Sequence, residues 1–125
     1  MDEKTFLDAS ENGDIDAIKD GLFGGIDVNT SDEHYRTALM KAAKHGHSDI
    51  VELLLENGAN VNVRDNRGTS ALYWASSKGH HDIVKLLVDH QCEVNIVDDR
   101  GWSAKDQANY NHHDGIVNLL EQAGA

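Results

Sequence analysis

The sequence predicts an all-α-dominated repeat solenoid, in which each repeat consists of a helix, a turn, a second helix and an extended finger. The first observation is a period of 33 residues that continues without an insertion. It aligns three glycines in one column and three histidines in the next: Gly13, Gly46, Gly79, His47, His80 and His113. The second observation is an apolar pattern at i, i+1, i+3 and i+4, as in Ile50, Val51, Leu53 and Leu54. Such a pattern is typical of one face of a short amphipathic helix.

The four registers of this period predict one domain over residues 1–125, with repeats at about 1–32, 33–65, 66–98 and 99–125. A compact chain of 125 residues would remove roughly two thirds of its unfolded surface from water, enough for an independent core. The outer repeats are more polar than the inner two, with Asp14 and Asp20 in the first and Lys105 and Asn109 in the last. Since a repeat stack needs a wettable face at each end, we expect these repeats to be caps of a complete four-repeat protein.

The first helix of an inner repeat is predicted from Leu39, Ala42 and Ala43 and from their counterparts one repeat later. The small residues would let neighbouring helices approach closely while leucine fills the space between them. Thr37 stands where a helix N-cap is needed, as Ser70 and Ser103 do in the next repeats, so helix initiation is expected at each. Glycine at position 46 or 79 would close the helix in a left-handed cap.

The second helix is expected to follow at once, because His47-Ser48-Asp49 offers polar side chains that could cap it, and to end at Gly58. Short β-favouring stretches come next, at residues 26–29, 59–63 and 92–97. The tetrapeptides at 65–68 and 98–101 then have strong turn chemistry. These features predict an extended finger after each helix pair.

Two positions depart from the repeat pattern. Tyr35 occupies the finger column that holds Gly68 and Gly101, so the first finger is expected to have a distorted or wider turn. Gly21 replaces a leucine of the second helix, at a cost of about 1 kcal/mol in helix propensity alone. We therefore predict a fraying N-terminal repeat, and uniformly slow amide exchange over residues 14–23 would contradict this.

The segment from Lys44 to Asn62, KHGHSDIVELLLENGANVN, closely resembles the ankyrin repeat, and the resemblance covers about residues 5–125. It implies an ankyrin-repeat stack of antiparallel helix pairs, with β-hairpin fingers nearly perpendicular to the helices. It also implies that the histidine column at 47, 80 and 113 makes hydrogen bonds that fix the turn between helices. The chain departs from the usual Thr-Pro-Leu-His at the start of the first helix, where it has Thr37-Ala38-Leu39-Met40. The preset φ of proline and the hydrogen bonds of that histidine are lost.

The family resemblance implies that partners contact the finger tips and the exposed face of each first helix, which form a continuous concave strip. Asp8, Glu11 and Asn12 would extend this strip at the acidic end. Transferred by column, the candidate partner-binding residues are Glu33, His34, Arg36, Lys41, Lys44, His45, Asn66, Arg67, Thr69, Trp74, Ser77, Lys78, Asp99, Arg100, Trp102, Gln107, Tyr110 and Asn111. The expected anchors are the aromatic and arginine side chains: Trp74, Trp102, Tyr110, Arg67 and Arg100. The alternative for Trp74 is that it packs between repeats.

Charge and hydropathy limit the kinds of partner and compartment. The net charge is −11, and residues 1–32 alone contribute −7, from nine acids and two bases. This sign argues against nucleic acid and anionic membranes as partners. The acidic end is interpreted either as a solvated cap or as a surface that attracts a basic partner. The acidic N-terminus and the lack of a long apolar run predict neither a signal peptide nor a membrane span, hence a cytoplasmic or nuclear protein. A monomer is expected.

No residue pattern predicts catalysis, a cofactor or a metal site. Phosphate-loop, nucleophile-elbow and zinc-protease motifs are missing, and Cys92 occupies a packing column. Eight histidines leave open a metal-binding or metal-dependent enzymatic role, but those in equivalent columns should lie about 10 Å apart, too far to share one ion. Glu93-Val94-Asn95 resembles the site that asparaginyl hydroxylases modify in ankyrin repeats; the alternative is that Asn95 orders the finger.

The sequence thus predicts a protein that acts by stoichiometric binding and not by turnover. Rigid helices would present side chains without the entropic cost of ordering a loop. Two functional variants stay open: an adaptor or scaffold that joins components, and an inhibitor that occludes a partner's active site.

Overall fold

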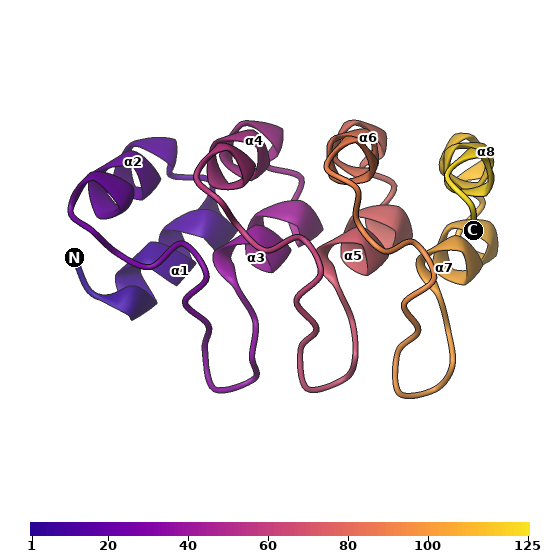
Figure 1. Ribbon diagram of the computed structural model, residues 1–125, viewed down its shortest axis with the longest axis horizontal. Helices are drawn as coiled ribbons and strands as arrows, with labels where there is room; N and C mark the ends of the chain where they lie inside the picture. Colours follow the sequence, from indigo (N-terminus) through magenta and orange to yellow (C-terminus); the bar gives the residue numbers. More distant parts are fainter.

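The computed structural model describes residues 1–125 as eight α-helices with no sheet (Figure 1). The helices are α1 (Glu3–Asn12), α2 (Ile15–Phe23), α3 (Ala38–Lys44), α4 (Ser48–Glu56), α5 (Ala71–Lys78), α6 (His81–Asp89), α7 (Ala104–Tyr110) and α8 (Asp114–Gln122). Consecutive helices pair, the four pairs stack side by side, and the two termini lie at opposite ends of the array (Figure 1). The predicted all-α repeat solenoid is confirmed.

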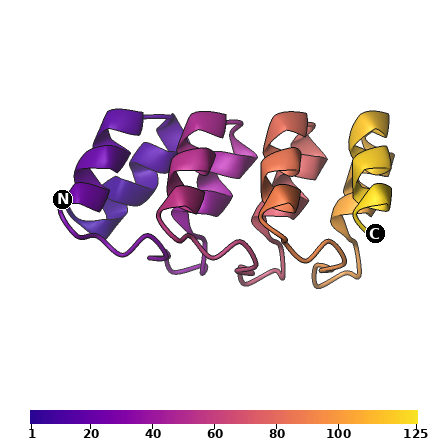
Figure 2. The same ribbon diagram turned by 45° about the horizontal axis from the view of Figure 1, so that its top comes forward.

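The stack has two rows of helices. The first helices of the pairs, α1, α3, α5 and α7, form one row, and α2, α4, α6 and α8 form the other; the finger loops extend from the side of the first row (Figure 2). Neighbouring first helices contact one another more extensively than neighbouring second helices do. The array therefore curves toward its first helices, and this side, with the fingers, is its concave face.

One core runs through all four repeats and consists of 24 buried residues. The predicted apolar columns supply most of it, and Ile50, Val51 and Leu54 are fully buried. Ala42 and Ala75, on the first helices, are also fully buried. Because alanine has little bulk, adjacent first helices come close together, as the sequence predicted.

The expected N-caps of the first helices are present. The hydroxyl of Thr37 accepts a hydrogen bond from the backbone N–H of Met40, at 3.3 Å, and Ser70 and Ser103 cap α5 and α7 in the same way. The second helices differ: α4, α6 and α8 have a histidine at the N-cap position and no side-chain capping bond. The histidines therefore do not cap their own helices, and of the side chains predicted to cap, only Asp49 accepts a first-turn N–H, that of Ile50 at 2.8 Å.

The histidines instead connect neighbouring repeats. The Nε2–H of His47 donates to the Glu11 carbonyl oxygen at 2.9 Å, His80 donates to the Lys44 carbonyl at 3.1 Å, and His113 donates to the Ser77 carbonyl at 3.2 Å. Each accepting carbonyl lies near the end of the preceding repeat's first helix, where helical carbonyls lack an intrahelical partner. The hydrogen-bonding role is as expected, but the bonds hold one repeat against the next.

The fingers contain almost no β-structure. Two isolated bridges pair Ser31 with Thr37 and Val97 with Ser103, and the middle finger has none. The stretches expected to be β-favouring, at 26–29, 59–63 and 92–97, form turns and irregular segments without a ladder. A hairpin this short gains few interstrand hydrogen bonds, so other contacts must fix its shape.

A column of aspartates provides those contacts. One carboxylate oxygen of Asp32 accepts hydrogen bonds from the backbone N–H groups two and four residues further on, and Asp65 and Asp98 do the same. This arrangement also explains why Tyr35 does not distort the first finger. Its φ is 64°, close to the 78° of Gly68, and both backbone N–H groups bond the aspartate carbonyl at 3.0 Å. The expectation of a distorted or wider turn was wrong, because the aspartate holds tyrosine in a conformation that costs about 1 kcal/mol.

Gly21 has a packing partner that the sequence did not reveal. A Cβ atom at Gly21 would lie 2.6 Å from Cδ1 of Phe6, whose ring is fully buried. Phe6 occupies the column of Leu39 and Leu72, while Gly21 occupies that of Leu54. In the first repeat, phenylalanine and glycine therefore replace the two leucines that the inner repeats have at these positions. The fraying of residues 14–23 stays a prediction.

The single substitution Gly21→Leu introduces the leucine that the inner repeats have in this column. It is expected to destabilise the protein by about 2 kcal/mol, because overpacking against Phe6 outweighs the gain in helix propensity. The double variant Phe6→Leu, Gly21→Leu should recover most of this loss, since it restores the leucine pair of the inner repeats. Urea unfolding monitored by circular dichroism measures both values. A stabilised Gly21→Leu variant would contradict the packing argument.

Candidate functional site

The concave strip, defined as the finger tips and the exposed faces of α1, α3, α5 and α7, includes nearly all residues proposed from the sequence. Most of them are solvent-exposed: Glu33, His34, His45, Asn66, Arg67, Lys78, Asp99, Arg100, Trp102, Tyr110 and Asn111. A second group is half-buried: Arg36, Lys41, Lys44, Trp74, Ser77 and Gln107. Ser77 donates to Gln107 Oε1 at 3.2 Å, so these two side chains connect α5 with α7.

Thr69 differs from the rest because its side chain is inaccessible, with 3% of the residue exposed. Its hydroxyl donates to the buried carboxylate of Asp65 at 2.7 Å and accepts from Nε1 of Trp74 at 2.8 Å. The hydroxyl thus fixes the orientation of the indole. Thr69 supports the surface from below, where no partner can contact it.

Trp74 joins two repeats at the centre of the strip. Its indole N–H is bound to its own finger through Thr69, and the Lys44 Nζ of the preceding repeat lies 4.5 Å from the ring centroid. Tyr73 contacts it edge-on, with ring centroids 5.4 Å apart. Trp74 thus packs across a repeat boundary and keeps one part exposed, while its role as an anchor for a partner stays a prediction. A cation over a tryptophan face contributes about 0.5–1 kcal/mol at such partly exposed sites.

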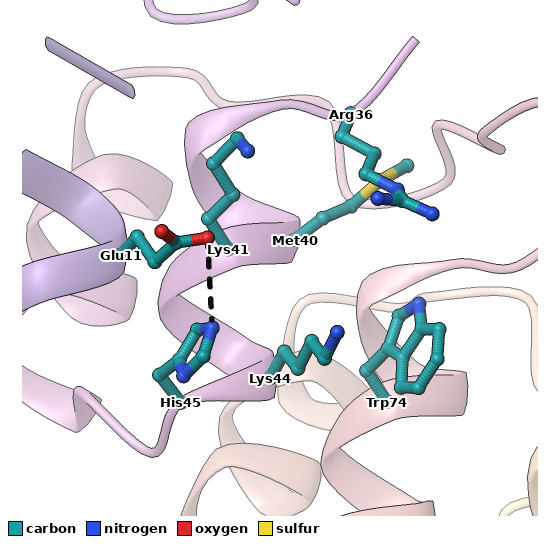
Figure 3. A pocket seen from close by; sticks show the side chains of 7 residues that line it. All are labelled: Glu11, Arg36, Met40, Lys41, Lys44, His45 and Trp74. Atoms are coloured by element: carbon teal, nitrogen blue, oxygen red, sulfur yellow. Dashed lines mark ion pairs between the residues drawn. The ribbon is translucent and has the colours of Figure 1, made fainter. Parts of the chain in front are cut away.

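Seven residues from the first three repeats line a small hollow beside this indole, which we call the cationic hollow (Figure 3). They are Glu11, Arg36, Met40, Lys41, Lys44, His45 and Trp74. In Figure 3 the guanidinium of Arg36 and the ammonium of Lys44 both point toward the indole, while the Lys41 ammonium points away from it. The hollow has a free volume of about 30 Å³, room for only a few atoms.

The cations of the hollow are unequally neutralised. Lys41 Nζ lies 3.2 Å from Asp32, and Arg36 Nε donates to Asp65 at 3.3 Å. Lys44 has no carboxylate within 4.0 Å. Burial, together with the nearby charges of Arg36, Lys78 and Lys41, lowers the pKa of Lys44 below its ordinary value, and Glu11 opposes this only in part. Most of the charges that act on Lys44 are therefore positive, although the whole chain is acidic.

The edge of the hollow nearest the first repeat has a different balance. His45 Nε2 lies 3.7 Å from Glu11, and both side chains are about half exposed. Burial lowers the pKa of His45, while Glu11 acts in the opposite direction. Glu11 thus marks the point on the strip where the acidic first repeat meets the cations of the second.

Two aromatic side chains form the other exposed feature of the strip, at its fourth repeat. The rings of Trp102 and Tyr110 are 5.9 Å apart and nearly perpendicular, at 89°. Trp102 is 39% exposed and Tyr110 is 70% exposed, so this aromatic pair presents apolar area to solvent. Both were proposed as anchors from the sequence, but their mutual contact was not.

Sequence reasoning missed the aspartates beneath the strip. Asp65 connects the finger backbone with Arg36 and Thr69, and Asp98 accepts a hydrogen bond from the Tyr73 hydroxyl at 2.8 Å. Burial and this bond raise the pKa of Tyr73 to about 12. The available signal was the recurrence of aspartate at 32, 65 and 98, one period apart. By itself this recurrence indicates turn chemistry and does not reveal the contacts to other side chains.

The chemistry-bearing residues outside the strip do not converge. No three histidine, cysteine, aspartate or glutamate side chains lie close enough together to hold one metal ion. Burial raises the pKa of Cys92 to about 11, which leaves little thiolate at neutral pH. Asn95 Nδ2 donates to the Gly124 carbonyl at 3.3 Å, a structural contact. Among the helices, none has the length and apolar character needed to cross a bilayer.

Comparison with known families gives one match. A family model described as Ankyrin repeats (3 copies) matches residues 6–98 and, in a second register, residues 57–125. The two matches together cover all four helix pairs. No curated protein matches the sequence.

Proposed function

Because the chain belongs to the ankyrin-repeat family, whose repeats generally mediate protein–protein interaction, we propose that it binds a protein partner stoichiometrically through its concave strip. The partner would contact the finger tips and first helices, and no turnover would be involved. Fold alone does not specify a partner, so the proposal depends on the surface of this chain.

The observation that supports the proposal best is the aromatic pair. Tryptophan and tyrosine are enriched among residues that dominate binding energy, and Trp102 and Tyr110 are both exposed on the predicted face. Their edge-on contact limits the motion of both rings before a partner arrives. A partner that covers them would gain apolar burial at little entropic cost.

Replacing both aromatic residues, in a Trp102→Ala, Tyr110→Ala variant, is expected to weaken partner binding at least tenfold. Tagged wild-type and variant proteins, each shown by circular dichroism to be folded, would be used to capture partners from a lysate of the source organism, with quantitative mass spectrometry as readout. Phe23→Ala is the matched control, because Phe23 is 97% exposed but lies on α2, outside the strip. Equal recovery by all three proteins would contradict the proposal.

Adaptor and inhibitor roles both fit this mode of binding. An adaptor would leave its partner active and bring a further component into the complex, whereas an inhibitor would cover the partner's active site. The captured complex distinguishes them by its composition and by the activity of the partner before and after the chain is added.

The acidic first repeat is proposed to guide a partner with a basic surface. Nine acids against two bases in residues 1–32 produce a field that acts over roughly one Debye length, about 10 Å at 0.1 M salt. We expect the association rate to fall severalfold when the salt concentration is raised from about 0.05 to 0.5 M. Stopped-flow mixing with the captured partner measures this. An association rate independent of salt would contradict the guiding role and leave concave binding unaffected.

A further inference from the structure

The basic residues of this acidic chain gather on its concave strip. The chain has 11 lysines and arginines in all, and six of them belong to the strip: Arg36, Lys41, Lys44, Arg67, Lys78 and Arg100. Around Arg67 and Arg100 the charge is balanced, because Asp98 and Asp99 line the same hollow. In the cationic hollow, Asp65 and Asp32 pair with Arg36 and Lys41, so the cations without an ion-pair partner are Lys44 and Lys78 beside it.

Three side chains at this place have nitrogen donors that make no hydrogen bond or ion pair inside the protein. Lys44 and Lys78 have no carboxylate within 4.0 Å. Arg36 uses only its Nε toward Asp65, and its two terminal nitrogens make no hydrogen bond within the chain. Arg36 is held in place by a carboxylate that is itself 0% exposed, so its free nitrogens are presented from a fixed position.

We propose that the cationic hollow binds an acidic side chain of the partner, with the carboxylate between Arg36 and Lys44 and against the edge of Trp74. This inference rests on the proposed function and adds the chemistry of the partner's contacting segment: it contains an aspartate or glutamate. The planar guanidinium suits a carboxylate, since two parallel N–H groups can bind its two oxygens.

The size and polarity of the hollow match such a group. A cavity of roughly 10–15 Å³ holds one water molecule, so about 30 Å³ accommodates two or three atoms of that size, as in a carboxylate. An entering anion would offset the mutual repulsion of Arg36, Lys44 and Lys78. Burial first, and then the charges of Arg36 and Lys78, already lower the pKa of Lys44. Because the site is half-buried, the attraction is less screened than at an open surface.

The surroundings favour a short acidic segment over nucleic acid. A polynucleotide would extend past the hollow onto the first repeat, whose residues 1–32 have a net charge of −7. Repulsion there would oppose binding of a long polyanion. A single carboxylate experiences mainly the potential within a Debye length of the hollow.

The layout also gives the order of groups on the partner. The hollow lies mainly on the second and third repeats, and the aromatic pair lies on the fourth. With about 10 Å between repeats, a segment of about 12 extended residues spans the strip. Its acidic residue would bind at the centre, and an apolar residue would contact Trp102 and Tyr110 toward one end.

Selection from a random library of displayed 12-residue peptides tests the proposal on the folded full chain. Peptides enriched on the wild-type protein should contain more aspartate and glutamate than the library. They should bind a Lys44→Gln, Lys78→Gln variant about tenfold more weakly. The matched control is Lys19→Gln, Lys85→Gln, which removes the same charge from an exposed column of α2 and α6 and should leave binding unchanged. A single-stranded dT12 oligonucleotide is the nucleic-acid probe and should not bind.

The outcomes separate this inference from the proposed function. The proposal that an acidic side chain binds in the cationic hollow is overturned if the enriched peptides lack acidic residues. It is also overturned if they bind the Lys44→Gln, Lys78→Gln variant as tightly as the wild type. If the same peptides still lose affinity in the Trp102→Ala, Tyr110→Ala variant, binding through the concave strip is supported without an acidic contact in the cationic hollow. Peptides unaffected by either variant overturn both. No enrichment of acidic peptides, or tighter binding of dT12 than of any peptide, also overturns the proposal.

Discussion

Replacing Asp65 by alanine is expected to lower the free energy of unfolding by about 3 kcal/mol, although the residue lies in a finger and not in the apolar core. Its carboxylate is 0% exposed and accepts four hydrogen bonds, from the backbone of Arg67 and Thr69, the Thr69 hydroxyl and Arg36 Nε. Truncation leaves these donors without their acceptor, and the desolvation cost of each is then uncompensated. Urea denaturation monitored by circular dichroism measures the loss.

Asp99→Ala is the matched control for this substitution. Asp99 is an exposed aspartate of the next finger whose carboxylate accepts no hydrogen bond within the chain. Its removal should change the free energy of unfolding by less than about 0.5 kcal/mol. Similar losses for the two variants would mean that the hydrogen bonds of Asp65 contribute nothing specific.

The same network sets a pH dependence. Burial by itself would raise the pKa of Asp65, but the hydrogen bonds from Thr69, Arg67 and Arg36 outweigh it and hold the pKa below the ordinary 3.8. Hydrogen bonds likewise outweigh burial and lower the pKa of Asp32 and Asp98. A folded-state pKa below that of the unfolded chain gives stability that is present above pH 3.8 and is lost as the pH falls through the folded value. The urea midpoint should therefore drop steeply below about pH 4, and less steeply in an Asp65→Asn variant.

The sequence was sufficient for the fold because the repeat makes its signals redundant. Thr37 and Ser70 predict helix starts, Gly46 and Gly79 predict helix ends, and each signal recurs 33 residues later. The contacts between repeats could not be predicted from the sequence. The histidine at position 47 could cap its own helix or bond the preceding repeat, and only the stacked geometry decides between these.

For the candidate site, prediction by column failed where the side chains in one column differ in size. Arg36, Thr69 and Trp102 occupy the same column, so transfer by position predicted that all three face a partner. Thr69 is too short to reach the surface and lies beneath Trp74, whereas Trp102 extends into solvent. The pairing of the cations in the hollow was hidden for another reason. The sequence placed the cations at 36, 41, 44 and 78 on one strip, but only the fold shows that carboxylates pair with those at 36 and 41 and not with those at 44 and 78.

Replacing Gly79 by alanine is expected to destabilise the protein by about 3 kcal/mol, because two effects add. Gly79 has φ of +82°, a conformation that costs an alanine about 1 kcal/mol. The added Cβ would also lie 2.6 Å from Cε1 of His113, which donates the hydrogen bond to Ser77 that connects the third and fourth repeats. Displacing the ring gives up this bond and disturbs the packing around it, at a cost of about 2 kcal/mol.

Gly58→Ala separates the two effects, since Gly58 has φ of +84° but a Cβ atom added there would meet no other atom within 4 Å. It should cost only about 1 kcal/mol. In a His113→Ala background the destabilisation caused by Gly79→Ala should also fall to about 1 kcal/mol, because the imidazole ring that the new Cβ would displace is gone. If the destabilisation stays at about 3 kcal/mol in that background, a steric link between the repeats is refuted. The link matters for binding because the aromatic pair lies on the fourth repeat and the cationic hollow on the earlier ones. A loosened fourth repeat would no longer hold the two features at a fixed separation, so Gly79→Ala should also weaken peptides that contact both.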